Sequence, residues 1–518
     1  MYCFHDIINT KSKIHPRKVF IKSHNRKLSY SNFVIKANIL ASYFNNKNLK
    51  KGDRVAIMTF NCLEFVETMY ATSKLGLIIV PINFRNSIKE FEEVIIQSKC
   101  NFLIFQEQFF DICKLAWEKK IIEKKNLLII SKKKIYPSIK SYRNIFASKT
   151  DTSSKVTRTK KINKEDIWSI MFTSGTTGKP KGVVRNHESY YLLSLTTSIE
   201  LGIKNEDSAL LVMPLCHANS FNFFCAYALN GTTINIYTNE KFSAKTFLDL
   251  IISNNVSFTS LVPTHYIMIL DYIKENNLTQ LDQLKVKFMI SSAPARKETK
   301  KLILHHFKNS SLYELYGSSE SGWVTMLHPN EQFSNLGSVG RECVGSSNVK
   351  ILNAKKKEVK EGKVGELYAC TPYNFSYYWN NKEKTKEAFL NDYVTVGDLA
   401  YRDKKGYIYL VDRKQNMIIS GGENIYPSEI ESIISLYEKI KDVAVVGQQD
   451  RKWGEIVCAF LVLKKDNDFD EISFYKWIRK KIAKYKQPKK IIIIKQEDMP
   501  INSTGKIIHS NLRKLLKN

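Results

Sequence analysis

The sequence predicts an α/β protein with a large N-terminal domain of parallel-sheet subdomains and a small, mobile α+β C-terminal domain. Over roughly the first four hundred residues, short apolar runs alternate with helical patterns, which is typical of parallel strands joined by crossover helices. The last hundred or so residues change to a shorter α+β pattern. The 518 residues, of which 43% are hydrophobic, are enough to bury a sizeable core.

The N-terminal pattern begins with an amphipathic helix and continues as strand, helix, strand. Residues 32–44 place Phe33, Ile35 and Phe44 on the apolar stripe of a helix. A buried strand is expected at 55–60, a helix at 63–75 and a second apolar run at 76–80. Similar runs, which periodicity alone does not separate from buried helix, recur at 101–105, 127–130, 233–237, 258–262 and 288–291.

Two composition changes divide the chain. Residues 131–164 are rich in Lys, Ser and Thr, so we expect an exposed, loosely ordered connection that leads into an apolar strand at 168–172. A second boundary lies near residue 412, which predicts domains at 1–412 and 413–518 with a hinge near Gln415. The smaller domain should contain a helix starting at Pro427 and strands at 443–446, 456–463 and 491–494.

The formal net charge of +30 raises the question of an anionic partner. Lysines outnumber arginines several-fold and are spread along the chain, whereas base and phosphate recognition in nucleic acids favours clustered arginine. We therefore expect no nucleic acid partner. The positive charge favours binding of anionic small molecules, and peripheral contact with a membrane surface stays an open alternative.

The chain's start and its cysteines indicate a cytoplasmic protein. The first residues lack the continuous apolar core of a signal peptide, and no segment is long and apolar enough to span a bilayer. Nine cysteines are scattered from Cys3 to Cys458, and none forms a CxxC pair. Scattered thiols of this kind fit a reducing compartment.

The most informative segment is the loop after the strand at 168–172, which holds four hydroxyls, three glycines and two lysines between residues 173 and 182. Glycines let backbone N–H groups turn toward one anion, while hydroxyls and lysines complement phosphate oxygens. The string is far more specific than a generic polar surface loop, and its spacing is not that of a Walker A loop. The candidate phosphate contacts are Thr173, Ser174, Gly175, Thr176, Thr177, Gly178, Lys179 and Lys181.

This loop resembles the phosphate loop of the adenylate-forming superfamily, which includes acyl-CoA synthetases, peptide-synthetase adenylation domains and firefly luciferase. Further signatures of that superfamily follow in the expected order along essentially the whole chain, at 214–217, 316–320, 396–398, 412–414 and 500–506. The resemblance implies an acyl-CoA synthetase: a carboxylic acid–CoA ligase that forms acyl-AMP and pyrophosphate from an acid and ATP, then a thioester with coenzyme A. It implies ATP, Mg²⁺ and coenzyme A as cofactor and co-substrates, and a role such as fatty acid metabolism.

The resemblance also assigns the nucleotide site and the catalytic groups. Lys506, Glu320 and Thr173 would be catalytic, with Glu320 reaching Mg²⁺ and Lys506 placed between the carboxylate and the α-phosphate. Two positions depart from the usual pattern: Ser319 keeps the hydroxyl of the usual Thr, whereas Val396 loses one. The remaining implied nucleotide contacts are Ser292, Ala293, Pro294, Tyr316, Gly317, Ser318, Asp398 and Arg413.

Two further sets of residues are implied for the acyl group and for coenzyme A. The acyl pocket would be lined by His217, Asn219, Ser291 and Gly317, although a lone His in an apolar stretch is also common as a packing residue. The coenzyme A contacts would be Gly421, Gly422, Trp453, Tyr485 and Lys489. The residues leave the acid open, with a short or medium aliphatic acid, or a modified one, favoured.

Two alternatives stay open at this point. The enzyme could load a free-standing carrier protein instead of coenzyme A. It could also be a non-catalytic relative that only binds a nucleotide or an anionic surface, although the intact motifs argue against decay.

Overall fold

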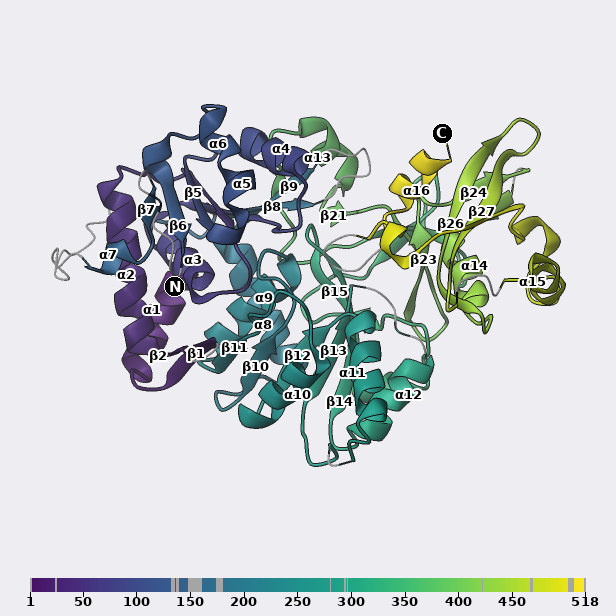
Figure 1. Cartoon of the computed structure of the whole chain (residues 1–518), viewed down its shortest axis with the longest axis horizontal. Helices are drawn as coiled ribbons and strands as arrows, with labels where there is room; N and C mark the ends of the chain where they lie inside the picture. Colours follow the sequence, from purple (N-terminus) through teal and green to yellow (C-terminus); the bar gives the residue numbers. More distant parts are fainter. Residues whose placement is uncertain are drawn as a thin grey trace. The chain divides into compact units, whose positions relative to one another are not determined.

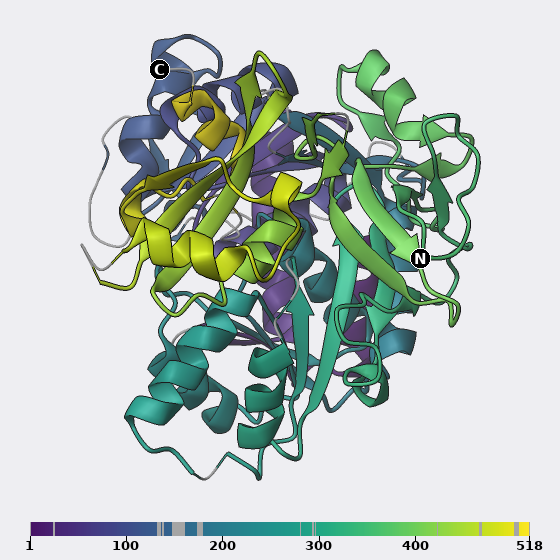
Figure 2. The ribbon, with the colours of Figure 1, turned by 90° about the vertical axis from the view of Figure 1, so that its right-hand side faces the viewer.

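The structure is a computed structural model with two compact units (Figure 1; Figure 2, turned by 90°). It describes the whole chain except residues 1, 24–25, 132–135, 137–138, 148–160, 174–179, 280, 293–294, 296, 422, 466–468, 502–506 and 517–518. Unit 1 comprises Met1–Asn348 and Ala369–Val394, and unit 2 comprises Val349–Tyr368 and Thr395–Asn518. The domain boundary predicted near residue 412 stays a prediction.

Unit 1 contains two large, mainly parallel sheets. The first has the strand order β16-β15-β14-β13-β12-β10-β11-β1-β2 and the second β19-β9-β8-β4-β3-β5-β6-β7. The strands of the first sheet are β1 (Val19–Ser23), β2 (Arg26–Ser29), β10 (Ser208–Leu211), β11 (Thr233–Ile236), β12 (Phe258–Leu261), β13 (Lys287–Ser291), β14 (Ser311–Ser318), β15 (Gly322–Leu327) and β16 (Arg341–Glu342). Those of the second are β3 (Arg54–Met58), β4 (Ile78–Ile82), β5 (Phe102–Gln106), β6 (Leu127–Ile130), β7 (Lys140–Ser141), β8 (Ile167–Thr173), β9 (Lys181–Asn186) and β19 (Tyr377–Tyr378).

The helices of unit 1 form three layers around these sheets. One continuous core joins both sheets through α1 (Phe4–Ile14), α2 (Tyr30–Asn46), α3 (Leu63–Leu75), α8 (His187–Leu201) and α9 (Ala218–Leu229). The outer face of the first sheet packs on α10 (Ala244–Ser253), α11 (Pro263–Glu275) and α12 (Lys297–His306), which lie beside its teal strands in Figure 1. The outer face of the second packs on α4 (Ile88–Ser98), α5 (Phe110–Cys113) and α6 (Leu115–Glu118). The short elements α7 (Asn144–Ala147), α13 (Lys382–Ala388), β20 (Phe389–Leu390) and β21 (Tyr393–Val394) complete the unit.

Unit 2 contains two smaller sheets. Strands β17 (Lys350–Leu352), β18 (Gly365–Tyr368), β22 (Asp398–Arg402) and β23 (Ile408–Arg413) form one antiparallel sheet. Strands β24 (Ile418–Ser420), β25 (Glu423–Ile425), β26 (Ile440–Asp450), β27 (Gly454–Leu463) and β28 (Lys490–Ile493) form the other. Helices α14 (Pro427–Ile434) and α15 (Glu471–Ile478) pack on one face of the second sheet and α16 (His509–Leu515) on the other, and Figure 1 shows α15 and α16 on opposite sides of the strands.

The observed α/β architecture confirms the predicted fold class, and several predicted elements agree closely in extent. The helix expected at 63–75 has the bounds of α3, and the run at 127–130 is β6. The helix expected at 32–44 is longer, and Ile35 does not belong to its apolar stripe because its side chain is 55% exposed. Residue 35 lies two positions from Phe33, about 200° around a helix, so the two side chains face opposite ways.

The stretch 131–164 differs in part from expectation. Among its described residues it contains two short elements, β7 and α7, that its polar composition did not predict. Within the part of the chain that the structure describes, no helix has the length and apolar character to cross a membrane.

Candidate functional site

The predicted phosphate loop joins the ends of an antiparallel hairpin. Strand β8 ends at Thr173, β9 begins at Lys181, and these two residues are opposite each other in the pairing. The strand ends therefore hold the base of the loop at a fixed separation. The predicted contacts from Ser174 to Lys179 lie outside the described residues.

A buried carboxylate lies close to this base. Strand β19 pairs with β9, which places Tyr378 opposite Val183. The Lys181 Nζ lies 4.8 Å from the centre of the Tyr378 ring, and the Tyr378 hydroxyl donates to Glu320 Oε1 over 2.7 Å. Glu320 is 7% exposed. Residues far apart in the sequence thus bring a cation, a phenol and an acidic group together.

The turn that carries Glu320 is held by Arg185 of β9. Its guanidinium donates through Nε to the Ser319 carbonyl over 2.9 Å and through Nη1 to the Tyr373 carbonyl over 2.7 Å. The Phe375 N–H donates to the Glu320 carbonyl over 2.7 Å. Burial lowers the pKa of Arg185 below that of a free guanidinium. The sequence did not predict a role for Arg185 or Tyr378.

The residues before Glu320 end strand β14. Tyr316 is 8% exposed, and the Ser318 hydroxyl accepts from the Ser321 N–H over 2.9 Å, which closes the turn. A Cβ added to Gly317 would lie 2.1 Å from the Gly322 carbonyl oxygen, so only glycine fits there. Ser319 follows in the same turn. The structure therefore places the predicted segment 316–320 in one tight strand end beside Lys181.

The donor set at Glu320 fits a hard divalent cation. One carboxylate oxygen accepts from Tyr378, and among the described residues no hydrogen-bond donor is recorded for the other. Mg²⁺ is typically held by one or two protein carboxylates together with phosphate oxygens and water. A buried carboxylate with one oriented and one available oxygen meets that requirement, so Glu320 is the candidate ligand.

The predicted acyl-pocket residues meet at the carboxyl ends of neighbouring parallel strands. Asn219, at the start of α9 after β10, donates through Nδ2 to the Ser291 hydroxyl at the end of β13 over 3.0 Å. Ser291 is opposite Leu315 of β14, so Gly317 lies two residues beyond it along the adjacent strand. Ser292 follows with a left-handed φ of 71°. Ala293 and Pro294 lie outside the described residues.

His217 precedes α9 directly. Burial lowers the pKa of its imidazole to about 4, and the Arg85 charge lowers it further in the same direction. The imidazole is therefore neutral at neutral pH, which favours a packing or hydrogen-bonding role over a charged contact.

The predicted ribose contacts in unit 2 form an ion pair. Asp398 and Arg413 are opposite each other in β22 and β23, and Arg413 Nε lies 3.1 Å from Asp398 Oδ1. Val396, which lacks the usual hydroxyl, follows Thr395, whose Oγ1 accepts from the Gly397 N–H over 3.0 Å. A neighbouring hydroxyl thus closes this turn, and the Asp398 carboxylate is oriented by a guanidinium.

The predicted hinge is tied to the C-terminal helix. Arg513 of α16 donates through Nη1 to the Gln415 carbonyl over 2.7 Å and through Nη2 to the Asn416 carbonyl over 2.9 Å. On the other side of Gln415, the Asp412 carboxylate accepts from the Ser428 N–H over 2.9 Å. The sequence did not predict Arg513, since nothing local to the hinge indicates its partner.

Three of the five predicted coenzyme A contacts meet in unit 2. Gly421 has a φ of 59° and donates its N–H to the Trp453 carbonyl over 2.8 Å, and the Lys489 Nζ lies 4.0 Å from the centre of the Trp453 ring. Trp453 is 43% exposed, so the platform faces solvent. Tyr485 is 45% exposed, with the Nζ of the neighbouring Lys486 lying 5.7 Å from its ring centre. Gly422 and the predicted catalytic Lys506 lie outside the described residues.

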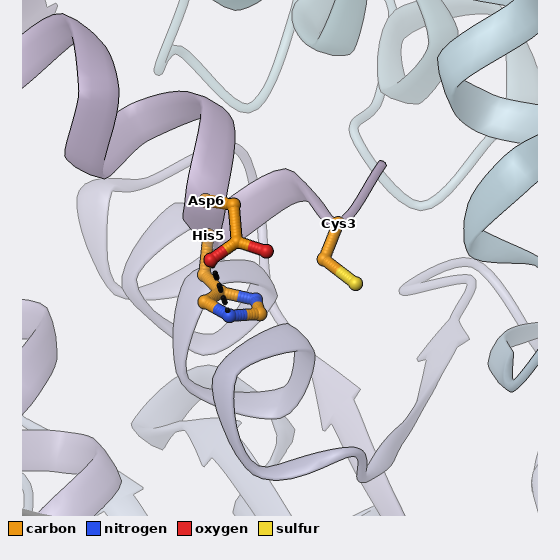
Figure 3. Close-up of side chains that lie close together, drawn as sticks. All are labelled: Cys3, His5 and Asp6. Atoms are coloured by element: carbon orange, nitrogen blue, oxygen red, sulfur yellow. Dashed lines mark ion pairs between the residues drawn. The ribbon is translucent and has the colours of Figure 1, made fainter. Parts of the chain in front are cut away.

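A second group of side chains of metal-ligating type lies at the start of α1 (Figure 3). One ligand atom each from Cys3, His5 and Asp6 lies within 4.8 Å of the others. The His5 imidazole is already placed between the Ser73 hydroxyl, 2.9 Å from Nδ1, and the Asp6 carboxylate, 3.2 Å from Nε2. These two contacts account for the arrangement, and we assign no metal to it.

The sequence matches two family descriptions that cover most of the chain. Residues 9–379 match the AMP-binding enzymes, and residues 429–506 match the AMP-binding enzyme C-terminal domain. These matches include the hairpin loop, the Glu320 turn and the predicted Lys506.

Curated relatives and solved structures are similar over nearly the whole chain. A 2-succinylbenzoate–CoA ligase of Oceanobacillus iheyensis is 29% identical over 466 residues, covering 90% of this chain and 89% of that protein. The long-chain-fatty-acid–CoA ligase FadD13 of Mycobacterium tuberculosis is 29% identical over 489 residues, covering 94% and 93%. The ATP-bound structure of MatB from Rhodopseudomonas palustris has a TM-score of 0.86 at 25% identity and covers 99% of each chain.

Proposed function

Because the chain belongs to the family of AMP-binding enzymes, we propose which of its residues carry out the two steps of an acyl-CoA synthetase. The chain is an acyl-CoA synthetase, which activates a carboxylic acid with ATP and Mg²⁺ and then transfers the acyl group to coenzyme A. The observation that carries the residue assignment is the buried Glu320 carboxylate, oriented by Tyr378 beside Lys181 at the base of the loop.

In the first step, an oxygen of the substrate carboxylate attacks the α-phosphorus of ATP, the bond to the β-phosphate breaks, and pyrophosphate leaves. Thr173, Lys181 and the loop between them contact the phosphates, and Ser319 donates to the α-phosphate. Glu320 would hold Mg²⁺, which would supply positive charge to the phosphate oxygens. Lys506 would lower the repulsion between the two anions that react and would stabilise the transition state.

The nucleoside is held by a separate set of side chains. The Tyr316 ring faces the adenine, next to the turn that begins at Ser292. The Asp398 carboxylate accepts hydrogen bonds from the ribose hydroxyls, and its ion pair with Arg413, 3.1 Å long, fixes its orientation. A carboxylate with a fixed orientation suits a pair of neighbouring hydroxyls because both bonds then form without further ordering.

In the second step, the thiolate of coenzyme A attacks the acyl carbonyl carbon, the carbon–oxygen bond to AMP breaks, and AMP leaves. Gly421 and Gly422 allow the pantetheine arm to approach closely. Trp453, Tyr485 and Lys489 offer aromatic faces and a cation to the nucleotide part of coenzyme A. Between the steps the C-terminal domain changes its arrangement about Gln415.

The acid lies against His217, Asn219, Ser291 and Gly317. The names of the relatives include an aromatic acid and long-chain fatty acids, which supports an organic acid of moderate to large size and a place in fatty acid metabolism. Apart from Cys3, the cysteines are free thiols, which supports a reducing compartment, and we place the enzyme in the cytoplasm.

The test is acid-dependent pyrophosphate release, measured with a panel of carboxylic acids in the presence of coenzyme A or a free-standing carrier protein. We expect turnover to continue with coenzyme A and to yield its thioester. If a thioester forms on the carrier protein and none forms with coenzyme A, the carrier protein is the acceptor. Absence of pyrophosphate release across the panel, with nucleotide binding intact, would favour a non-catalytic relative.

A further inference from the structure

One residue of the predicted acyl pocket has a buried polar atom that the described residues leave without a partner. The Asn219 Nδ2 donates to Ser291, but its Oδ1 accepts nothing from the described residues. Asn222, one turn further along α9 and 2% exposed, has neither amide atom paired among them.

Asn219 lies where a ligand of this fold would be expected. Helices α9 and α11 follow β10 and β12, which are neighbours in the parallel sheet, and Ser291 ends the next strand, β13. Ligands of such sheets bind beyond the carboxyl ends of the strands. The adjacent strand β14 ends in the segment we assign to ATP, so the acid lies between that segment and α9 if the proposed function is correct.

An unpaired buried amide is costly unless something else pairs with it. Leaving one such group unsatisfied destabilises the folded protein, and buried polar groups in proteins are almost always hydrogen-bonded. The Asn219 amide is held in place by Ser291, whose hydroxyl lies 3.1 Å from that of Ser260. Ser260 and Ser291 are each 3% exposed, so this chain of side chains is part of the core rather than a solvated surface.

We propose that the acyl pocket selects carboxylic acids that carry an uncharged hydrogen-bond donor, such as a hydroxyl, which Asn219 Oδ1 accepts. This inference rests on the proposed function and adds a substrate class to it. An amide oxygen can only accept, which excludes a bare hydrocarbon as its partner. The members of the chain, Asn219, Ser291 and Ser260, are all uncharged, which favours a neutral donor over a second carboxylate.

The cationic Arg85 supports a different substrate class, a dicarboxylic acid. The Arg85 charge lowers the pKa of both His217 and His265, each of which burial brings to about 4, so its guanidinium lies within electrostatic reach of both. A dicarboxylic acid could use that charge. The experiment therefore compares three acids of each size: unsubstituted, hydroxylated and dicarboxylic.

The probes are acyl-sulfamoyl adenosines, which mimic the acyl-adenylate and bind without turnover. Octanoyl, 3-hydroxyoctanoyl and suberoyl analogues, together with benzoyl, 2-hydroxybenzoyl and phthaloyl analogues, are titrated by calorimetry. We expect a hydroxylated analogue to bind about tenfold more tightly than its unsubstituted partner. Asn219→Leu should abolish that difference, and Ser291→Ala should reduce it.

The controls separate specificity from folding. Asn230→Leu changes an asparagine just after the other end of α9, where its amide donates to Ser198, and should leave the ratio unchanged. Ser291→Ala removes one hydroxyl and keeps the test available if Asn219→Leu does not fold. Equal or weaker binding of both hydroxylated analogues overturns the inference. So does preferred binding of a dicarboxylic analogue that Arg85→Met abolishes and Asn219→Leu leaves intact.

Failure of the proposed function would look different. Absence of ATP-dependent thioester formation with every acid refutes the synthetase mechanism whatever the calorimetry shows. A hydroxyl preference lost in Asn219→Leu would still establish the pocket's selectivity.

Discussion

Gly421→Val tests whether thioester formation depends on the geometry around Trp453. The Gly421 φ of 59° is left-handed, a conformation that a β-branched residue rarely adopts. A Cβ at this position would lie 3.0 Å from Trp453 Cε3, closer than normal contact between carbon atoms. The exposed indole must therefore move, and it takes with it the platform that it forms with Lys489, whose Nζ is 4.0 Å away.

The expected magnitude follows from these two effects. Left-handed backbone costs a non-glycine residue roughly 1–2 kcal/mol, which should appear as a loss of stability in unit 2. Stacking of a base on an aromatic side chain is worth about 1–3 kcal/mol, so displacing Trp453 should weaken binding of coenzyme A by about 5- to 150-fold. Adenylation should change by less than about twofold, because in the proposed mechanism neither Gly421 nor Trp453 contacts ATP or the acid.

The two steps are measured separately. Pyrophosphate exchange into ATP reports adenylation, and the rate of acyl-CoA formation from preformed adenylate reports the second step. Gly362→Val is the matched control: Gly362 is also left-handed, at 72°, but a Cβ there meets nothing within 4 Å. Equal loss in both steps, or the same thioester defect in the Gly362 variant, would refute the assignment of this face to coenzyme A.

Four further changes probe the rest of the site. Lys506→Ala should abolish adenylation and leave preformed adenylate able to react with coenzyme A, and equal loss of both steps would contradict the two-arrangement mechanism. Tyr378→Phe should raise the Mg²⁺ concentration needed for half-maximal adenylation by about 10–100-fold, because ligating carboxylates rely on their hydrogen-bond partners. Added Mg²⁺ should restore the rate. An unchanged Mg²⁺ titration would contradict the assignment of Glu320 as the ligand. Arg185→Met leaves the Ser319 and Tyr373 carbonyls without their donor and should lower the free energy of unfolding, measured in urea, by about 3 kcal/mol. A loss below about 1 kcal/mol would contradict the role of the guanidinium in holding the turn. His217→Gln should reduce the loss of stability on the acid side of the profile of unfolding free energy against pH. The wild-type imidazole has a pKa of about 4 in the folded protein and 6.5 when unfolded, so it makes stability fall as the pH drops from 6.5 to 4. An identical profile in the variant would contradict the burial of His217.

Local periodicity and motif strings predicted much of the fold. The helix at 63–75 and the strand at 127–130 were predictable because their apolar patterns are continuous and bounded by turn residues. Ile35 was misplaced because an apolar residue near a helical stripe need not lie on it. The pairing of β9 with β19 joins residues nearly two hundred positions apart, and no local pattern specifies such a pairing.

The same distinction applies to the site. Segment 316–320 was predictable because its residues act together within one turn. Tyr378 and Arg185 were not, since each contributes one side chain from a distant strand to the placement of Glu320. The closeness of Asn219 to Ser291 needed the order of β10, β12 and β13 in the sheet, which the sequence does not reveal.

The most direct test of the synthetase mechanism is the fate of the carboxylate oxygen. A substrate acid labelled with ¹⁸O in its carboxyl group is turned over with unlabelled ATP, Mg²⁺ and coenzyme A, and the nucleotide products are weighed by mass spectrometry. Attack on the α-phosphorus predicts AMP that carries one ¹⁸O atom for each acyl-CoA formed. Unlabelled AMP, or ADP with labelled inorganic phosphate, would contradict an acyl-adenylate intermediate.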